Sequence, residues 1–151
     1  MRPRAVHLLP VALAVMAIGA GPCGQSQSAD TGGFKGDEKD VAQTIFDFRD
    51  AVAKRDESKI CDTYFTVALK DQVTAKGKAA GRGSSCAKVI KDSIADIDAT
   101  DIKVQDVTIT GTTATVKVKT NLTKGADPVD TLTLEKVTTG QSSAWRISVL
   151  P

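Results

Sequence analysis

The hydrophobic period of this chain changes once, near Ala99, from that of a helix to that of a strand. Before Ala99 apolar residues recur at spacings of three and four, and after it they alternate with Thr, Lys, Glu, Arg or Ser. A helix repeats every 3.6 residues and a strand every two, so the sequence predicts helices first and strands second. This order is typical of an α+β domain, in which helices cover one face of an antiparallel sheet.

Two long helices are expected first. The first covers residues 38–55, with acidic residues in its first turn and Lys54 and Arg55 at its end, the polarity that a helix dipole favours. Its apolar face consists of Val41, Ile45, Phe48 and Val52. The second helix begins at Asp56 or Ser58 and fades near Val73. Its apolar stripe consists of Ile60, Cys61, Tyr64, Phe65, Ala68 and Leu69.

A glycine-rich segment over residues 75–83 predicts a solvated loop between the second helix and a third. Its Gly, Lys and Arg residues lack the ordered spacing of a phosphate-binding loop, and no strand precedes it. The third helix begins at Ser84 or Ser85 and is short. It carries Cys86, followed by the apolar residues Val89, Ile90, Ile94 and Ile97.

Four strands are expected after Ala99, and they form an antiparallel meander. A change of phase at Gln105-Asp106 indicates a β-bulge in the first strand. Turns are expected at Gly111 and at Gly140-Gln141. The apolar side chains of the last strand, which face the helices in this prediction, are Trp145, Ile147 and Val149.

The first 22 residues have the pattern of a signal peptide. Arg2 and Arg4 precede an apolar run over residues 5–20, and small residues follow it. The alternative is a retained signal anchor, but a membrane span needs ~20 apolar residues and this run is shorter. Export is therefore the prediction for residues 1–22.

Cys23 lies where a bacterial lipoprotein signal places its lipid-modified cysteine. Residues 23–36 are rich in Gly, Ser and Gln and are expected to form a flexible tether, with the folded domain over residues 37–151. Ala20 and Pro22 depart from the usual lipobox residues. The alternative is ordinary cleavage near residues 19–21, which leaves Cys23 free or paired with another molecule.

The charge balance gives no case for nucleic acid. The chain has 20 basic and 18 acidic residues, and Arg2 and Arg4 belong to the leader, which leaves 18 of each. A nucleic-acid-binding domain is expected to carry a clustered basic surface.

Cys61 and Cys86 are expected to form a disulfide that joins the second and third helices. In an exported protein a cysteine pair is usually oxidised. The rival interpretations are a metal pair or a reactive thiol. Metal ligation needs further Cys or His ligands, and His7, the one histidine, lies in the leader. No metal ion and no cofactor are predicted.

Taken together, several short motifs resemble the small exported lipoproteins of high-GC Gram-positive bacteria that have an NTF2-like (SnoaL-like, cystatin-like) fold. The motifs are Cys61-Asp62, Ser85-Cys86, Val107-Thr108-Ile109, Ala114-Thr115-Val116-Lys117-Val118 and Trp145-Arg146-Ile147-Ser148. The resemblance implies a curved four-stranded antiparallel sheet that forms a cone around the helices. Tyr64, Phe65 and Trp145 are then the candidate pocket residues inside this cone.

Enzymatic relatives in this family, such as ketosteroid isomerases and polyketide cyclases, place Asp, Tyr and His inside the cone. Here the catalytic candidates are Tyr64 and Asp62, but Asp62 is expected to face solvent and the mature chain has no histidine. We therefore predict a non-catalytic module. An isomerase-type or cyclase-type enzyme that uses Tyr64 and an acid is the alternative.

The expected role is that of an exported, lipid-anchored binding or interaction module at the outer face of the cytoplasmic membrane. Its partner is either a small apolar ligand in the cone or an envelope protein at its surface. A third hypothesis is a structural accessory subunit of an envelope complex, with no pocket. The sequence names no specific ligand or partner.

Overall fold

The computed structural model describes residues 31–95, 99–122 and 128–151. The predicted signal peptide, Cys23 and most of the predicted tether lie outside these residues. The described elements, in chain order, are α1 (Asp37–Ala53), α2 (Glu57–Lys59), the π-helical turn η1 (Ile60–Tyr64), α3 (Val67–Ala79), α4 (Cys86–Ile94), β1 (Ala99–Thr110), β2 (Thr113–Leu122), β3 (Val129–Thr139) and β4 (Ser142–Val149).

The four strands form one open antiparallel sheet in the order β1-β2-β3-β4. Two-residue turns at Gly111-Thr112 and Gly140-Gln141 join the first and last pairs, as the sequence predicts. The predicted bulge in β1 is also confirmed, because the register with β2 shifts between Val104 and Asp106. The sheet is therefore the expected meander, and it does not close on itself.

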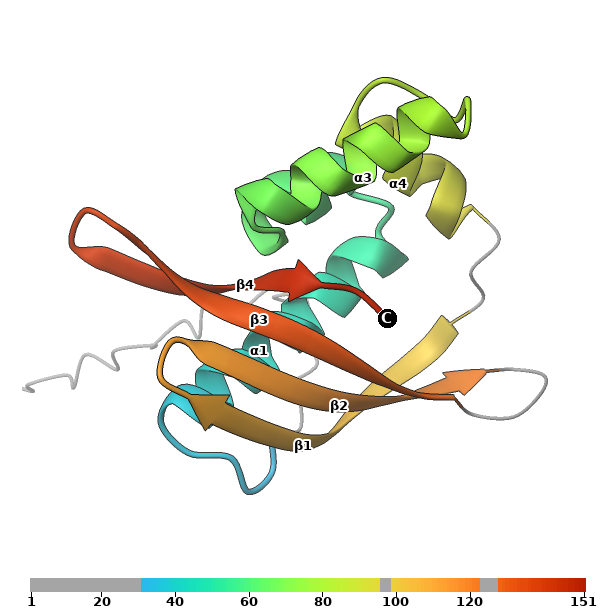
Figure 1. Ribbon diagram of the computed structural model, residues 1–151. Coiled ribbons are helices and arrows are strands. Elements are labelled where there is room, and N and C mark those ends of the chain that lie inside the picture. The colour runs from blue at the N-terminus through green and yellow to red at the C-terminus, as the bar shows by residue number, and fades with distance from the viewer. Residues whose placement is uncertain (1–30, 96–98, 123–127) are drawn as a thin grey trace, which may run out of the picture.

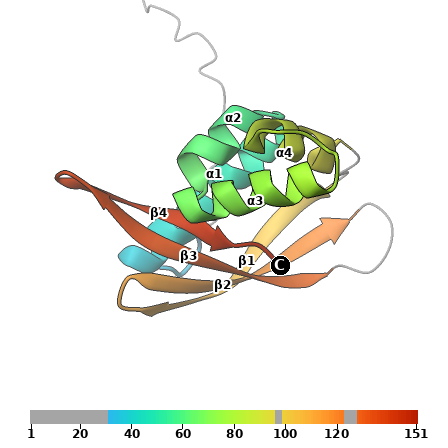
Figure 2. The ribbon, with the colours of Figure 1, turned by 45° about the horizontal axis from the view of Figure 1, so that its top comes forward.

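The helices lie on one side of the sheet (Figure 1). Helix α1 crosses the inner face, and α3 and α4 gather beyond the β4 edge, as Figure 2 shows after rotation. The outer face carries exposed polar side chains, among them Thr115, Lys117, Thr131 and Glu135. The α+β architecture with helices on one face of a four-stranded antiparallel sheet is thus confirmed.

A single hydrophobic core joins the helices to the inner face of the sheet. The most deeply buried large side chains are Phe65, Ile45, Ile60, Leu134, Ile147, Val41 and Val116. On α1, Val41 and Ile45 are buried and Phe48 and Val52 are partly buried, so the predicted apolar face of this helix is confirmed.

The predicted second helix is wrong as a continuous element. After α2 and η1 the chain leaves helical geometry at Phe65, whose φ of −91° and ψ of 146° are extended. Thr66 then caps α3, its Oγ1 accepting a hydrogen bond from the Leu69 N–H at 3.2 Å. The extended Phe65 lies parallel to Ile147, and the Thr66 N–H donates to Ile147 O at 2.9 Å. Pairing with the β4 edge therefore interrupts the helix.

Two further expectations fail locally. The loop predicted over residues 75–83 is helical as far as Ala79, and Gly77, a buried residue of α3, packs against Val89 of α4. In β4, Thr133 pairs with Val149 whereas the next residue, Leu134, pairs with Ile147, so the bulge adds one residue to β4. This bulge turns Val149 away from the core, and its side chain is 53% exposed.

Candidate functional site

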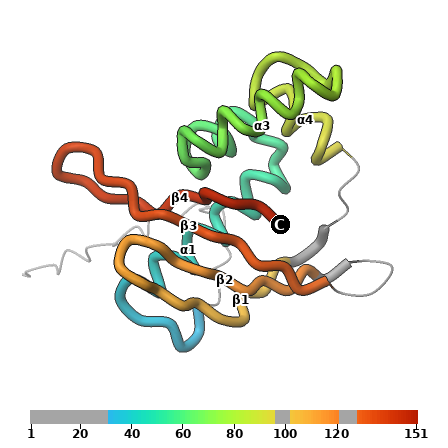
Figure 3. Tube along the Cα trace, viewed as in Figure 1, coloured from blue at the N-terminus to red at the C-terminus, as the bar shows by residue number. Residues whose placement is uncertain are grey.

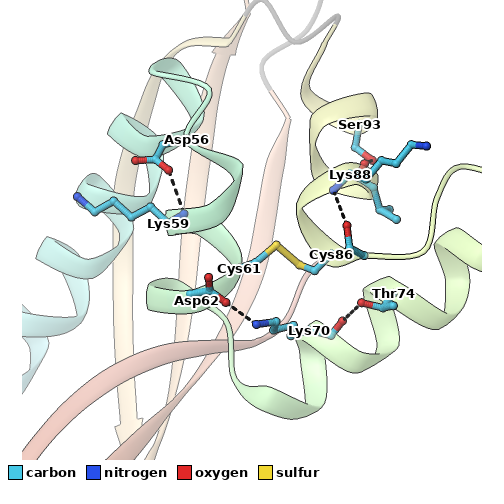
Figure 4. The surroundings of a disulfide bond; sticks show 11 residues. Asp56, Lys59, Cys61, Asp62, Lys70, Thr74, Cys86, Lys88 and Ser93 are labelled. Atoms are coloured by element: carbon cyan, nitrogen blue, oxygen red, sulfur yellow. Dashed lines mark hydrogen bonds and ion pairs between the residues drawn. A yellow bond between two sulfur atoms is a disulfide. The ribbon is translucent and has the colours of Figure 1, made fainter.

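The disulfide predicted between Cys61 and Cys86 is present. The two Cα atoms are 6.1 Å apart, and both residues are 3% exposed. Figure 4 shows the bond joining η1 to α4, with α3 passing beside it. The bond therefore fixes the position of η1 relative to α4, two segments that are 25 positions apart in the chain.

Local sequence explains why each cysteine lies at its position. Asp56 accepts a hydrogen bond from the Lys59 N–H at 3.0 Å, which starts the turn that leads into Cys61. Ser85 caps α4 in the same way, accepting from the Lys88 N–H at 3.4 Å, so Cys86 is the first residue of that helix. Two side-chain caps thus direct both sulfur atoms into the space between the helices.

The surface near the disulfide is polar. Asp62, the residue after Cys61, is exposed and forms an ion pair with Lys70 of α3. Asp62 therefore faces solvent as predicted, on the outside of η1. Tyr64, two residues further on, is buried at 6% exposure, so the two side chains predicted as catalytic candidates do not share a pocket.

A surface hollow of about 310 Å³ lies between α1 and the α2–η1 segment. Its lining consists of Gln43, Phe46, Asp47, Arg49, Asp50, Ala51, Lys54, Asp56, Lys59 and Tyr64. Cations of the protein cover both of its aromatic rings. Arg49 Cζ lies 5.3 Å from the centre of the Phe46 ring, and Lys59 Nζ lies 5.9 Å from the centre of the Tyr64 ring. Both rings are also nearly buried, since Phe46 and Tyr64 are each 6% exposed.

The carboxylates in this hollow already have partners within the protein. Asp47 accepts a hydrogen bond from Gln43 at 2.8 Å, Asp50 pairs with Arg49 at 2.8 Å, and Asp56 caps α2. Within the described part of the chain, no hydrogen bond joins the Tyr64 hydroxyl to a carboxylate. In this arrangement the Tyr64 hydroxyl is therefore not paired with any of these described carboxylates.

The other two candidate pocket residues lie in the core. Phe65 is 1% exposed and Trp145 is 5% exposed, and both belong to the same buried cluster as Tyr64. Trp145 Nε1 is buried without a hydrogen-bond partner in the described structure. The Trp145 ring has Lys136 Nζ 5.6 Å from its centre, and Lys136 pairs with Asp37 at the start of α1 at 2.8 Å.

Sequence reasoning missed the hollow because a tight turn without glycine forms it. Arg55 adopts a φ of 54°, and the Asp56 N–H donates to Ala51 O, so the chain reverses directly after α1. A glycine normally marks such a turn. Only the pair Lys54-Arg55 at the end of the predicted helix pointed to this position.

The described residues, 31–95, 99–122 and 128–151, hold no group of three His, Cys, Asp or Glu side chains placed to bind a metal ion. Over the same ranges, no helix is both long and apolar enough to span a bilayer. Comparison of the chain with protein-family models, with curated protein sequences and with solved structures finds no match in any of the three. The fold and the disulfide thus define an α+β domain with a stapled helical layer, by which we mean the helices that the Cys61–Cys86 bond links through η1 and α4.

Proposed function

We propose that the protein is an exported, lipid-anchored, non-catalytic interaction module of the bacterial cell envelope, with an NTF2-like domain. The disulfide between Cys61 and Cys86 is the observation that carries this proposal. A buried, fully enclosed disulfide suits a protein that works in an oxidising compartment, because the cytosol keeps such thiols reduced. The apolar leader and Cys23 supply the route of export and the anchor.

The packed interior favours a protein partner over a small apolar ligand. The residues of the candidate pocket are nearly buried, with Tyr64 6%, Phe65 1% and Trp145 5% exposed. All three belong to the same hydrophobic core cluster. Binding in this proposal therefore takes place at the surface, as an accessory subunit of an envelope complex would bind.

A catalytic alternative rests on one observation, which is that Tyr64 lines the same hollow as three aspartates. Catalysis there would require one of these carboxylates to leave its present partner and approach the tyrosine hydroxyl. The Tyr64→Phe variant separates the two functions, because it removes the hydroxyl and keeps the ring. An interaction module keeps its partner in this variant, whereas an enzyme loses its turnover.

Mass spectrometry of the mature protein from membranes tests the anchor and the disulfide together. The expected result is an N-terminus at Cys23 that carries lipid, and a peptide pair linked through Cys61 and Cys86. An unmodified Cys23, or an N-terminus elsewhere, would overturn the lipoprotein assignment. Reduced thiols at Cys61 and Cys86 would overturn the proposal that the protein works in an oxidising compartment.

Cross-linking in intact cells, followed by affinity capture, then tests the partner. The control is a Cys23→Ala variant, which should be exported but not anchored. We expect the anchored protein to be linked to one defined envelope protein and the unanchored variant to lose most of that product. Recovery of the protein with no linked partner in repeated captures would contradict the proposed interaction role.

A further inference from the structure

Four cations gather where α3 ends and α4 begins. They are Lys76, Lys78, Arg82 and Lys88, all of them exposed, and we call this group the basic tip. Between residues 72 and 91 the chain carries these four cations and Lys91 but no acidic residue, although the whole chain has 18 acidic residues. The positive charge of this segment is therefore not balanced by acids within the segment itself.

The packing of the two helices brings the lysines of the tip together. Gly77 of α3 lies against Val89 of α4, because a Cβ built on Gly77 would come within 2.0 Å of Val89 Cγ2. Lys76 and Lys78 flank Gly77 in the chain, and Lys88 precedes Val89. Three cations thus surround a single contact between the helices.

Backbone hydrogen bonds fix the turn that carries Arg82. The Arg82 N–H donates to Gly77 O at 2.9 Å, and the Gly81 N–H donates to Lys78 O at 3.1 Å. These two bonds form the Schellman arrangement at the end of α3, with Gly81 in the left-handed conformation at a φ of 68°. Arg82 is therefore held beside the last turn of α3, close to the lysines.

The tip cations differ from the cation that precedes them on α3. Lys70 forms an ion pair with Asp62 of η1. Over residues 31–95, 99–122 and 128–151, by contrast, no ion pair joins a side chain of the tip to an acidic one. The tip therefore presents its four charges to solvent.

An excess of negative charge lies on another part of the molecule. Residues 37–62, which comprise α1, α2 and the start of η1, hold eight acidic and five basic residues. Helix α1 begins on the far side of the molecule from the turn between α3 and α4, as Figures 2 and 3 both show. The domain is therefore electrically polar, with a basic tip at one end and acidic helices that begin at the other.

We propose that the basic tip rests on an anionic lipid surface, with the start of α1 turned away from it. The composition of the tip selects this partner. Apart from its cations, residues 75–85 are Ala, Gly and Ser, and no aromatic residue lies between Phe65 and Trp145. A protein partner requires an apolar or aromatic centre, and single-stranded nucleic acid requires rings on which its bases stack. A lipid surface requires only positive charge on long side chains, because it presents many phosphate groups in one plane.

The predicted tether is long enough for this orientation. Helices α1 and α4 have 17 and 9 residues, and Arg55, just after α1, donates to Ile94 O at the end of α4. Placed end to end, the two helices span at most about 40 Å. Residues 23–36 reach about 45 Å when fully extended. A domain anchored through Cys23 is therefore free to bring its tip to the membrane, and this step rests on the proposed function.

The contact is weak in solution and sufficient beside a membrane. One Lys or Arg close to an anionic surface raises the binding constant about fivefold, so four raise it on the order of 10³-fold. Salt weakens such binding, because charges are screened over about 10 Å at 0.1 M. The anchor makes the contact intramolecular, with an effective concentration on the order of millimolar.

Vesicle binding by the Cys23→Ala protein tests the proposal, because this protein has no lipid of its own. Co-sedimentation is measured with phosphatidylcholine vesicles that contain about one part in three of phosphatidylglycerol, and with pure phosphatidylcholine vesicles, at up to about 10 mM lipid. Each series is run at about 20 mM and about 200 mM salt.

Two triple variants in the Cys23→Ala protein locate the contact. The tip variant is Lys76→Gln/Lys78→Gln/Arg82→Gln. The matched control, Lys39→Gln/Lys103→Gln/Lys117→Gln, removes the same charge from exposed positions on α1, β1 and β2. Thermal melting of both confirms that they are folded, and the salt dependence of the unsubstituted tip is a second measure that needs no variant.

We expect binding to the anionic vesicles alone, lost at the higher salt. The tip variant should bind about a hundredfold more weakly, and the control variant less than threefold more weakly. No binding to anionic vesicles at low salt would overturn the proposal, as would equal binding to neutral vesicles or an equal loss in the control variant. Binding to soluble polyphosphate but not to anionic vesicles would also overturn it, since the tip would then recognise a free polyanion.

Failure of this proposal is distinguishable from failure of the proposed function. An unmodified Cys23 in the mature protein would refute the lipid anchor and leave vesicle binding through the tip unchanged. Conversely, a lipidated protein whose Cys23→Ala form ignores anionic vesicles would refute the tip contact alone.

Discussion

Gly77 of α3 lies directly against Val89 of α4, and a Cβ built on Gly77 would come within 2.0 Å of Val89 Cγ2. Real side chains do not approach so closely, so the two helices can pack at this distance only because position 77 has no side chain. The close approach brings α3 onto the helix that carries Cys86. Gly77 therefore determines how the stapled helical layer is assembled.

We predict that Gly77→Ala destabilises the protein by up to about 2 kcal/mol. Alanine favours a helix by ~1 kcal/mol over glycine. Overpacking against Val89, however, costs about 1–3 kcal/mol, because α3 must shift away from α4. Chemical denaturation measures the free energy of unfolding of each variant. The double variant Gly77→Ala/Val89→Ala should lose less stability than the sum of the two single losses. Strictly additive effects would contradict the contact.

Loss of the disulfide should destabilise the protein by about 3.5 kcal/mol. The bond closes a loop between cysteines 25 positions apart, which limits the unfolded chain. Denaturation of the wild type with and without reductant, and of Cys61→Ala/Cys86→Ala, measures this value. The two comparisons should agree.

The matched control for the disulfide is Asp62→Asn, which changes the residue beside Cys61. This variant removes the ion pair between Asp62 and Lys70. The pair is exposed, because the side chain of Lys70 is 43% and that of Asp62 62% exposed to solvent. Such a pair contributes less than ~1 kcal/mol. A reduced protein as stable as the oxidised one, or an Asp62→Asn variant that loses as much, would refute the role assigned to the disulfide.

The features that depend on local pattern could be predicted from the sequence. The alternation in four strands, the bulge near Gln105 and the pairing of Cys61 with Cys86 all follow from residue type and spacing, and the structure confirms them. The same pattern could not show that helix two ends at Phe65, because a contact with Ile147, 82 residues away in the chain, is what ends it.

Glycine marked the turns between strands correctly but was an unreliable signal in the helical part of the chain. Gly77 stands in a segment rich in glycine and indicates a loop, yet it lies in a helix because α4 requires a close approach there. Conversely, the left-handed turn after α1 uses Arg55, where the sequence gives no glycine to mark it. The hollow beside Tyr64 depends on that turn, so spacing alone could not predict it.

Arg55 has a strained backbone conformation, and its side chain forms two hydrogen bonds. Two substitutions separate the effect of the strain from that of the hydrogen bonds. Its φ is 54°, a conformation that costs a side-chain-bearing residue roughly 1–2 kcal/mol relative to glycine. Its guanidinium donates to Ile94 O at 3.3 Å and to Ala95 O at 3.1 Å, at the end of α4.

We expect Arg55→Ala to be destabilising, because it keeps the strain and loses both hydrogen bonds. Arg55→Gly should be more stable than Arg55→Ala by about 1 kcal/mol, since glycine adopts this conformation freely. Thermal melting of the three proteins measures the difference. Equal stability of the alanine and glycine variants would contradict the strain at this position.

Arg146 should hold the η1 turn against the β4 edge. Its Nη1 donates to Asp62 O at 3.1 Å and to Phe65 O at 3.4 Å, the carbonyl groups at the end of η1. Hydrogen bonds to a charged donor are worth more than neutral ones, so their loss should let this segment open more often. The Thr66 N–H, which donates to Ile147 O, reports that opening.

We predict that Arg146→Met speeds hydrogen exchange at the Thr66 N–H by about tenfold, since methionine keeps the apolar stem and removes the donors. NMR exchange rates at the Thr66 N–H and at core strand amides measure the effect, which should be confined to the η1–β4 contact. The control is Lys117→Met, which removes an exposed cation from the outer face of β2. Unchanged exchange at Thr66, or equal acceleration in Lys117→Met, would show that Arg146 does not hold this edge.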